Sequence, residues 1–404
     1  MRSDSQPYEG LLSHYPNIED HRPALKGILE EFGTPILACD REILIDRYQS
    51  LSNSLADHWG KHIIGYSFKT NYLVAESRVL QKQGAWAEVV SGREYELACR
   101  LAFPPSEIIY NGPYKDDSSL FSALANNSIV NINDHDELDR VIAHVAGNDR
   151  RHKIGIRVTS DLTRLGISRF GFSLENDEAR DAVRKIDACS ALTLVGLHTH
   201  LYGDTDDPEL YALAATRVGQ FAKHEIANYQ NSLEFIDMGG GFPAHSPKPK
   251  SRQEWNPQPI DVYIKHIAES LEQFFPNQAS RPLLIVEPGR YLTCDGIIFV
   301  TRVVHVKERF SKQLITCDGS LSMVPLTHYC PQIIRLFGPD LSRRQTKEVP
   351  SIIQGATCRE NDLLYDGAFA EAQVGDYLIH FAAGAYNSNL SPNFIFAAPE
   401  MKML

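Results

Sequence analysis

Short apolar segments of strand length recur along the chain, and most are followed by a turn and a helical pattern of apolar residues. We interpret eight of them as strands, at 62–68, 86–90, 107–110, 128–132, 153–158, 193–199, 233–238 and 283–287. Between the strands the spacing is helical, as for Val74, Val79 and Leu80 before Gly84. Eight strands that alternate with helices predict a (β/α)8 TIM barrel of about 250 residues, with a larger doubly wound sheet as the alternative.

Polar residues suited to chemistry follow the carboxyl ends of several predicted strands. Lys69 follows the first strand, His200 the sixth and Gly239–Gly241 the seventh, and the eighth strand ends at Glu287, just before Arg290. Barrel enzymes build their active sites at this end of their strands. The recurrence at strand after strand favours the barrel and predicts an active site at its mouth.

The pattern changes beyond Arg290, where helical spacing becomes weak. Strand-like segments occur at 297–306, 312–319, 351–356 and 376–386, and the apolar segment 35–39 resembles a strand that precedes the barrel. We therefore predict two domains, a barrel over 40–292 and a β-sandwich or barrel-like domain formed by 1–39 and 293–404. The Pro-rich stretch 244–259 is expected to be a surface loop between the seventh strand and its helix.

Composition excludes several classes of protein. The 404 residues carry a net charge of −11, which argues against nucleic acid or an anionic membrane as the main partner, because both require clustered Lys and Arg. No apolar run is long enough for a membrane-spanning helix, and the first residues lack the apolar stretch of a secretory signal. Seven cysteines, none in a CxxC pattern, argue against a disulfide framework. We expect a soluble, cytoplasmic protein.

Three features at the strand ends could carry chemistry. Desolvation at a partly dry barrel mouth would lower the pKa of Lys69 and make it nucleophilic, although a solvated lysine is the commoner case. Gly239, Gly240 and Gly241 offer backbone N–H groups to a phosphate, or form a plain flexible turn, and do not match an NTPase P-loop. Glu287 ends an apolar strand and needs a cationic partner, either Arg290 or a ligand nitrogen.

Four further residues have two interpretations each. His198 and His200 lie two apart on a strand and face the same side, as in metal-binding pairs, but we find no convincing set of further ligands and expect no metal. We expect His198 to pack inside the barrel and His200 to meet a ligand. Cys358 and Tyr386 lie in turn-like stretches and are either reactive groups or buried side chains.

The chain resembles the fold type III pyridoxal-phosphate decarboxylases, which include the diaminopimelate, ornithine and carboxynorspermidine decarboxylases. The resemblance runs over nearly the whole length, in order, through the segments FGTPILACD, GYSFKTN, AEVVSGREYELA, NGPYKDD, NINDHDEL, SRFGF, HTHL, DMGGGFP, VEPGR, TCDG, GATCREND and GDYLIHFAAGAY. Each motif is weak by itself, but the ordered set is specific. It implies an alanine-racemase-like barrel with a C-terminal β-rich domain that an N-terminal strand completes.

The resemblance implies a role for each candidate residue. Lys69 would hold pyridoxal 5'-phosphate as an imine, His200 would lie against the ring of the cofactor, and Glu287 would pair with the pyridine nitrogen. The implied phosphate contacts come from Gly239, Gly240, Gly241, Arg290 and, from the partner subunit, Tyr386. Cys358 would reach the site from the other subunit of a homodimer with shared sites.

The chemistry of decarboxylation fits this assignment. Loss of CO2 leaves an electron pair on Cα, and a carboxylate beside the pyridine nitrogen keeps the ring protonated, so that the ring can accept those electrons. An acid such as Cys358 would then deliver a proton to Cα. Alanine racemases of similar fold have an arginine facing this nitrogen, so Glu287 favours decarboxylation over racemisation.

Departures from the family pattern bear on the substrate. The family's HxGS motif is replaced by residues 200–204, which end in Asp204, so a serine that helps to hold phosphate is missing or displaced. Arg359 stands where ornithine and diaminopimelate decarboxylases carry an acid, and Val324-Pro325 stands near their Arg-Pro. A cation at 359 should attract a distal anion in the substrate, although Glu360 beside it could offset the field. Arg290, Arg359 and Glu360 are thus the expected substrate-binding residues.

We therefore hypothesise a pyridoxal-phosphate-dependent decarboxylase, similar to diaminopimelate decarboxylase, for an amino acid with an atypical or anionic distal group. Diaminopimelate-like compounds and carboxylated intermediates of siderophore or other secondary metabolism are candidates. The alternatives are a racemase-like enzyme, a non-catalytic cofactor-binding protein and, least favoured, a metal-dependent barrel hydrolase.

Overall fold

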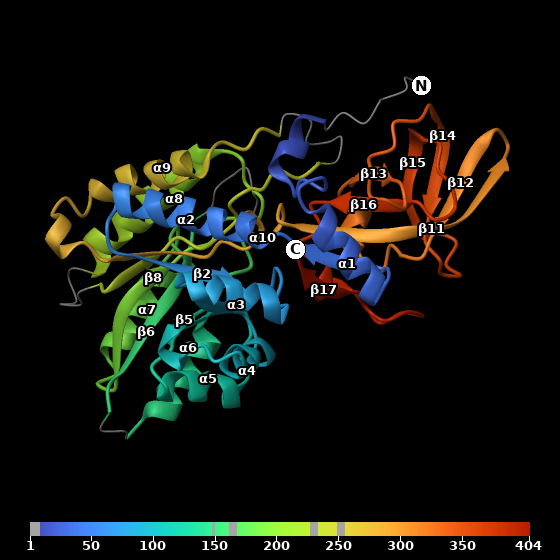
Figure 1. The fold of residues 1–404 in the computed structure, drawn as a ribbon. Coiled ribbons are helices and arrows are strands. Elements are labelled where there is room, and N and C mark those ends of the chain that lie inside the picture. The colour runs from blue at the N-terminus through green and yellow to red at the C-terminus, as the bar shows by residue number, and fades with distance from the viewer. Residues whose placement is uncertain (1–8, 148–149, 161–167, 227–232, 249–254) are drawn as a thin grey trace.

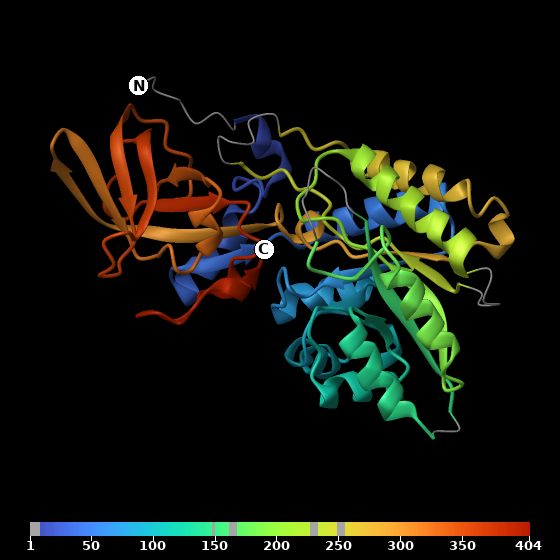
Figure 2. The same ribbon diagram turned by 180° about the vertical axis from the view of Figure 1, so that it is seen from behind.

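A computed structural model describes residues 9–147, 150–160, 168–226, 233–248 and 255–404. The chain forms two lobes, a barrel surrounded by helices and a strand-rich domain that contains both the start of the described chain and its end (Figures 1 and 2). In the described part of the chain, no helix is both long and apolar enough to span a membrane.

The predicted (β/α)8 barrel is confirmed. Its eight parallel strands close into a ring in the order β5-β4-β3-β2-β10-β9-β8-β6, with β5 pairing β6, and the two-residue strand β7 extends from β6. The strands are β2 (His62–Ser67), β3 (Trp86–Val89), β4 (Ile108–Tyr110), β5 (Ile129–Ile132), β6 (His152–Thr159), β7 (Phe172–Ser173), β8 (Leu192–His198), β9 (Phe235–Asp237) and β10 (Leu283–Val286). All eight segments predicted from apolar patterning are present, because buried parallel strands are continuous apolar runs bounded by turns.

Helices cover the outside of the barrel. They are α2 (Arg41–His58), α3 (Val74–Gln83), α4 (Gly92–Arg100), α5 (Asp117–Ala125), α6 (His135–Val145), α7 (Glu178–Asp187), α8 (Pro208–Phe221), α9 (Ile260–Glu272) and the short α10 (Arg290–Thr293). Several begin at a side-chain cap in the turn after a strand: Ser91 accepts from the N–H of Glu94 and Asp134 from that of Glu137. These caps stop the strand and start the helix in a short turn.

The interior of the barrel changes from apolar to polar along the strands. The apolar layer is one cluster of Ile63, Ile109, Val195, Phe235 and Ile285. Two residues further along three of these strands, on the same inward face, come Asn111, Asp237 and Glu287, all buried. Gly196 of β8 makes room for the apolar layer, because a Cβ there would overlap the ring of Phe235. The apolar layer thus supports a charged layer at the barrel mouth.

The second domain is rich in strands, as predicted, and forms an eight-stranded sheet. Its strands are β1 (Ile36–Cys39), β11 (Ile297–Arg309), β12 (Lys312–Cys317), β13 (Ile333–Phe337), β14 (Glu348–Gln354), β15 (Leu363–Ala370), β16 (Tyr377–Phe381) and β17 (Glu400–Met403). Strand β1 pairs antiparallel with β11 and parallel with β17, so the N-terminal segment completes the domain. Helix α1 (Arg22–Phe32) packs on it through Leu25 and Leu29. These pairings support the proposed division into 40–292 and 1–39 with 293–404.

Strands β7, β13, β15 and β17 were not predicted. Strand β15 contains Asp366-Gly367, which is a turn signal in sequence, and β17 consists of only four residues, two of them charged. Pairing within the sheet overrides these local preferences.

A buried ion pair fixes the loops after β4 and β5. The side chain of Lys115 is fully buried, and its Nζ donates to Glu137 Oε1 at 2.8 Å and to the backbone oxygens of Gly112 and Asn131. Replacing Lys115 by Met should lower the free energy of unfolding by about 3–5 kcal/mol, because Glu137 would remain buried without its partner. Urea denaturation measures the change.

The surface pair between Lys185 and Asp139 is the matched control. Lys185→Met should cost about 1 kcal/mol or less, since an exposed ion pair is screened by solvent. The double variant Lys115→Met/Glu137→Gln should be less destabilised than Lys115→Met alone. Equal losses for the buried and exposed pairs would contradict this account.

Candidate functional site

Lys69 lies at the mouth of the barrel in the turn directly after β2. Its Nζ donates to Glu88 Oε2 at 2.6 Å, and the same oxygen accepts from Ser67 Oγ at 2.6 Å. Glu88, on β3, is fully buried, whereas the side chain of Lys69 keeps 30% of its exposure. Lys69 is thus held on a buried carboxylate at the bottom of an accessible site.

The charge state of Lys69 differs from the sequence-based expectation. Burial does oppose the charge of this amine, as expected, but the carboxylates of Glu88 and Glu287 outweigh burial and raise the pKa of Lys69. Without a covalent partner Lys69 is therefore an ammonium ion. It becomes a nucleophile when a proton leaves Nζ, for which Glu88 is the adjacent acceptor.

Glu287, directly after β10, is a buried and ionised carboxylate. Its Oε1 accepts from Asn111 Nδ2 at 2.5 Å, and its Oε2 lies 3.5 Å from His198 Nε2. Although burial opposes the charge, His198, Asp237 and Lys69 hold the pKa of Glu287 well below its usual range. Burial and the negative charge of Glu287 raise the pKa of Asp237. The two pKa shifts have opposite directions, which favours the negative charge on Glu287 and the proton on Asp237.

His200 is neutral and held in one tautomer. Burial, Lys69 and Arg157 lower its pKa well below the ordinary value. Its Nδ1 accepts from the backbone N–H of Gly240 at 3.0 Å, so the ring proton is on Nε2. His198, as expected, is buried inside the barrel.

The glycine turn packs closely against its neighbours. A Cβ at Gly239 would lie 2.6 Å from His200 Nδ1, and one at Gly240 would clash with the backbone oxygen of Glu287. Gly239 and Gly241 have φ angles of 64° and 88°, which favour glycine. The N–H of Gly239 donates to Asp237 and that of Gly240 to His200, so among the described residues only the N–H of Gly241 in this turn makes no hydrogen bond. The resemblance implies phosphate contacts from all three glycines, whereas the N–H groups of Gly239 and Gly240 are bonded within the protein.

Arg290, at the start of α10, points into the same region. Its Nε lies 3.4 Å from Asp204 Oδ1, and its guanidinium lies over the ring of Tyr386, 5.0 Å from the centroid. Arg290 Nη1 is buried and has no hydrogen-bond partner among the described residues. An unpartnered guanidinium N–H beside a glycine turn is suited to an anion.

Tyr386 reaches the site within its own chain, which corrects the expectation that it comes from a partner subunit. Its backbone N–H donates to the oxygen of Thr70 at 2.9 Å, next to Lys69. The φ of Tyr386 is 56°, in the left-handed region that a tyrosine rarely adopts. Such strain concentrates at functional sites, where the surrounding structure enforces it.

Cys358, Arg359 and Glu360 are exposed in the loop between β14 and β15. Their side chains make no described contact with Lys69, His200 or Glu287 of the same chain. Arg359 Nε donates to Asn361, and its guanidinium lies 5.8 Å from the ring centroid of Phe394. The structure therefore brings together the barrel-mouth candidates and leaves these three apart from them.

The structure adds to the site four residues to which the sequence assigns no role: Glu88, Asn111, Arg157 and Asp237. Asn111 joins both acidic side chains, because its Nδ2 donates to Glu88 at 3.2 Å as well as to Glu287. Asn111 and Asp237 lie two positions after an inward apolar residue at the end of a strand. The period-2 alternation of a strand, continued past the apolar run, points both side chains into the barrel.

The mouth of this (β/α)8 barrel carries a lysine, a buried ionised carboxylate and a glycine turn. Together these groups define a barrel enzyme that binds a cofactor. Residues 42–294, well over half of the chain, match the family described as pyridoxal-dependent decarboxylase, pyridoxal binding domain. The chain belongs to this family and is a pyridoxal-phosphate-dependent carboxy-lyase.

Relatives of known activity cover almost the whole chain. The chain is 26% identical to the diaminopimelate decarboxylase of Aquifex aeolicus over 92% of its own length and 86% of the relative. It superposes on the crystal structure of M. jannaschii diaminopimelate decarboxylase in complex with L-lysine with a TM-score of 0.83, at 21% identity, over 94% and 89% of the two chains. The lysine/ornithine decarboxylase of Vibrio vulnificus, complexed with cadaverine, gives a TM-score of 0.80 at 21% identity, over 95% and 96%. The fold is thus shared across decarboxylases of several amino acids.

The residues present fit pyridoxal phosphate. The amine of Lys69 can bind the aldehyde of the cofactor as an imine, and ionised Glu287 can pair with a protonated ring nitrogen. Arg290 Nη1 and the N–H of Gly241 can donate hydrogen bonds to a phosphate oxygen. Potential ligand atoms of His198, His200 and Glu287 also lie within 4.8 Å of one another, as in a metal site. The family assigns this barrel to a pyridoxal cofactor instead, and the Nδ1 of His200 already accepts from Gly240.

The contact between Lys69 and Glu88 generates a testable prediction. In protein from which the cofactor has been removed, Glu88→Gln keeps a hydrogen-bond acceptor and removes the charge, so the pKa of Lys69 should fall. The rate at which Nζ reacts with an amine-directed reagent, followed by mass spectrometry as a function of pH, measures it. The peptide that carries the exposed Lys153 serves as internal control. An unchanged Lys69 profile would contradict the assigned cause.

Proposed function

We propose that this enzyme decarboxylates an amino acid of the diaminopimelate, lysine and ornithine type whose distal group is atypical or anionic. The observation that carries this proposal is Arg359, an exposed cation directly after Cys358. Val324, near the place where the family pattern has an arginine, is a fully buried aliphatic side chain. Binding of a substrate with an anionic distal group would therefore depend on Arg359. A substrate with a distal ammonium would be repelled by the same charge.

The bound cofactor supplies a sink for the electron pair that departing CO2 leaves on Cα. In the proposed roles, Lys69 holds the cofactor, Glu287 keeps the proton on the ring nitrogen, and neutral His200 packs against the ring. Arg290 and Gly241 hold the phosphate. Cys358 delivers the proton to Cα, which requires that its loop reach a barrel mouth.

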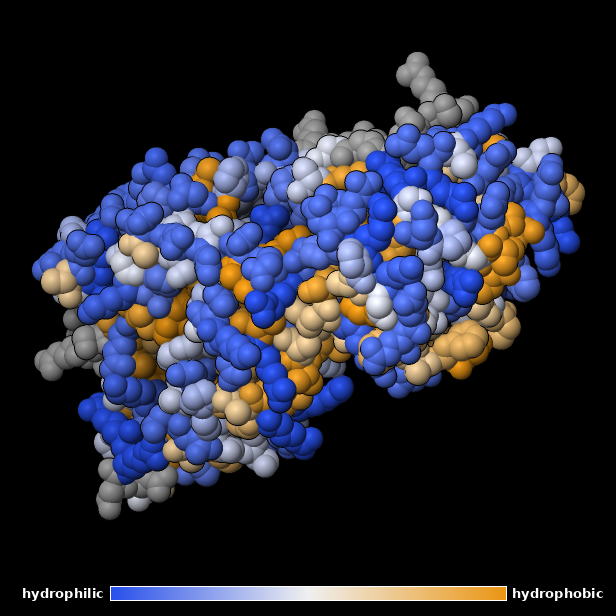
Figure 3. All heavy atoms as spheres, viewed as in Figure 1, coloured by the Kyte–Doolittle hydropathy of each residue, from blue (hydrophilic) through white to orange (hydrophobic). Residues whose placement is uncertain are grey.

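We infer that the active unit is a homodimer with shared sites. Cys358 is exposed in the second domain and makes no described contact with the mouth of its own barrel. The same face carries exposed apolar side chains, Leu390, Phe394, Ile395 and Phe396, and Arg359 lies over Phe394. Apolar residues form patches on the otherwise hydrophilic surface of this domain (Figure 3). Exposed apolar patches are expected where a second copy of the chain binds. A cytoplasmic location is also proposed, which the seven free thiols support.

Mixing two inactive variants tests the shared site. Lys69→Ala and Cys358→Ala should each lose activity, because each removes one half of every site. After the two variants are denatured together and refolded, or coexpressed, about a quarter of wild-type activity should return, since half of the dimers carry one intact site. CO2 release measures activity, and Cys99→Ala is the control for an exposed thiol elsewhere. Absence of recovery, with mixed dimers shown to be present, would contradict sharing.

Substrate choice tests the charge argument. CO2 release is measured over diaminopimelate, lysine, ornithine, arginine and citryl-linked amino acids, for the wild type and for Arg359→Glu. The wild type should prefer a distal anion, and the variant should shift at least about tenfold in kcat/KM toward dibasic substrates. Arg343→Glu, also in the second domain, is the matched charge control. A wild-type preference for lysine or ornithine, or no shift in the variant, would refute the role of Arg359.

A further inference from the structure

We propose that Asp204 and Lys248 form a buried, charge-compensated pair that positions Arg290 for the phosphate of the cofactor, in place of a phosphate-holding serine. The inference deepens the proposed function, because it rests on the phosphate site assigned to Arg290 and the glycine turn. It adds Lys248, a residue of the loop between β9 and α9, to the cofactor machinery.

Asp204 holds Arg290 from one side. The Oδ1 of Asp204 lies 3.4 Å from Arg290 Nε, and the ring of Tyr386 lies under the guanidinium. With two faces of the group fixed, Arg290 Nη1 is left buried and unpartnered. Thr205, the next residue, donates its backbone N–H to the oxygen of Gly241 at 2.9 Å, which ties Asp204 to the glycine turn. Asp204 is thus placed to aim Arg290.

Asp204 by itself would hinder phosphate binding. Its side chain keeps only 10% of its exposure, so water screens its charge weakly. A phosphate monoester carries nearly two negative charges at neutral pH, and a carboxylate close to its site repels it. Arg290 alone cannot both neutralise Asp204 and hold the phosphate at full strength.

Lys248 supplies the missing positive charge. Its Nζ donates to Asp204 Oδ2 and to Ser246 Oγ, the latter at 2.7 Å, and it lies 4.3 Å from the ring centroid of Trp255. The side chain of Lys248 is 2% exposed. Burying an amine of this kind is costly unless it is paired, so its position indicates a specific role beside Asp204.

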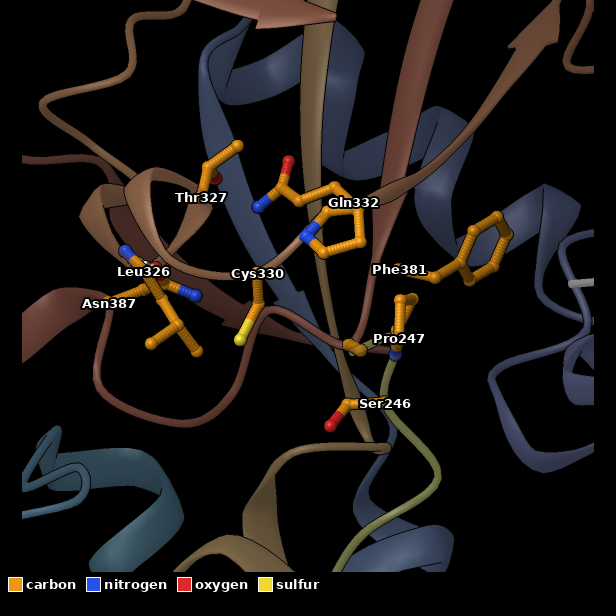
Figure 4. A pocket seen from close by; sticks show the side chains of 10 residues that line it. Ser246, Pro247, Leu326, Thr327, Cys330, Gln332, Phe381 and Asn387 are labelled. Carbon is orange, nitrogen blue, oxygen red and sulfur yellow. Dashed lines mark hydrogen bonds between the residues drawn. The ribbon is translucent and has the colours of Figure 1, made fainter. Parts of the chain in front are cut away.

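The loop that carries Lys248 is anchored to both domains. His245 lies 3.2 Å from Asp295, stacks on His14 with ring centroids 3.6 Å apart, and accepts from Tyr15 through its backbone oxygen. Ser246 and Pro247 line a pocket whose far wall comes from the second domain, with Cys330 opposite them (Figure 4). These contacts fix the three residues that precede Lys248, and with them the point from which its side chain reaches Asp204.

Loss of the positive charge of Lys248 should weaken the binding of pyridoxal phosphate. Lys248→Met leaves Asp204 negative beside the phosphate, so the dissociation constant of pyridoxal phosphate should rise about tenfold or more. Lys248→Arg keeps the charge and should bind nearly as the wild type does. Asp204→Asn removes the negative charge that repels the phosphate, so the double variant Lys248→Met/Asp204→Asn should recover most of the affinity.

The test titrates cofactor-free protein with pyridoxal phosphate and follows visible absorbance and tryptophan fluorescence, with thermal unfolding of each cofactor-free variant as a check on folding. Lys312→Met, which breaks a surface pair with Asp366, is the control variant. Pyridoxal, which lacks the phosphate, should bind the wild type and Lys248→Met equally. An unchanged affinity of Lys248→Met for pyridoxal phosphate overturns the proposal. A loss of affinity that the additional change Asp204→Asn does not restore also overturns it, because Lys248 would then contact the phosphate or act through folding. If the wild type itself binds no pyridoxal phosphate, the cofactor assignment fails instead.

Discussion

The arrangement of charge at the top of the barrel is the constraint on which the rest of the site depends. Eight parallel strands bring the buried carboxylates of Glu88 and Glu287 and the partly exposed ammonium of Lys69 together at one end of the barrel. Charges at this depth persist only when they are paired, so the position of each fixes the protonation of the next. The raised pKa of Asp237 and the lowered pKa of Glu287 favour the charge on Glu287, and a protonated ring nitrogen requires an ionised carboxylate beside it. The pairing of these buried charges therefore also creates the carboxylate and the amine that a pyridoxal cofactor needs.

Much of the fold could be predicted from the sequence because its signals are local. Each barrel strand is a short apolar run that ends in a turn, and a run of this kind is buried wherever it lies in the ring. Lys69, His200 and Glu287 were found because they stand where such runs end, and the structure brings them together. Strands β13 and β15 were missed, since their pairing partners, rather than their own residues, make them extended.

The parts of the site that could not be predicted depend on distance in space. Desolvation of Lys69 was anticipated, but Glu88 lies 19 residues away in the chain, and its position reverses the direction of the pKa shift. Tyr386 was assigned to the wrong subunit, because a motif does not show which copy of the chain supplies it. The contact between Lys248 and Asp204 spans 44 residues and closes only when two loops of the barrel mouth meet. Contacts of this kind cannot be predicted from the periodicity of hydrophobic residues.

The place of β1 has a consequence for the order in which the protein acquires its shape. Strand β1 precedes every strand of the barrel in the chain, yet it lies between β11 and β17, which follow the barrel. All strands of the barrel are synthesised before β11, so the barrel can begin to close while β1 still lacks both of its neighbours. The sheet of the second domain, by contrast, is complete only after β17 has been made. An unfinished chain can therefore hold Lys69 and Glu287 together before the loop with Cys358 exists, and the ability to bind the cofactor would precede the ability to complete the reaction.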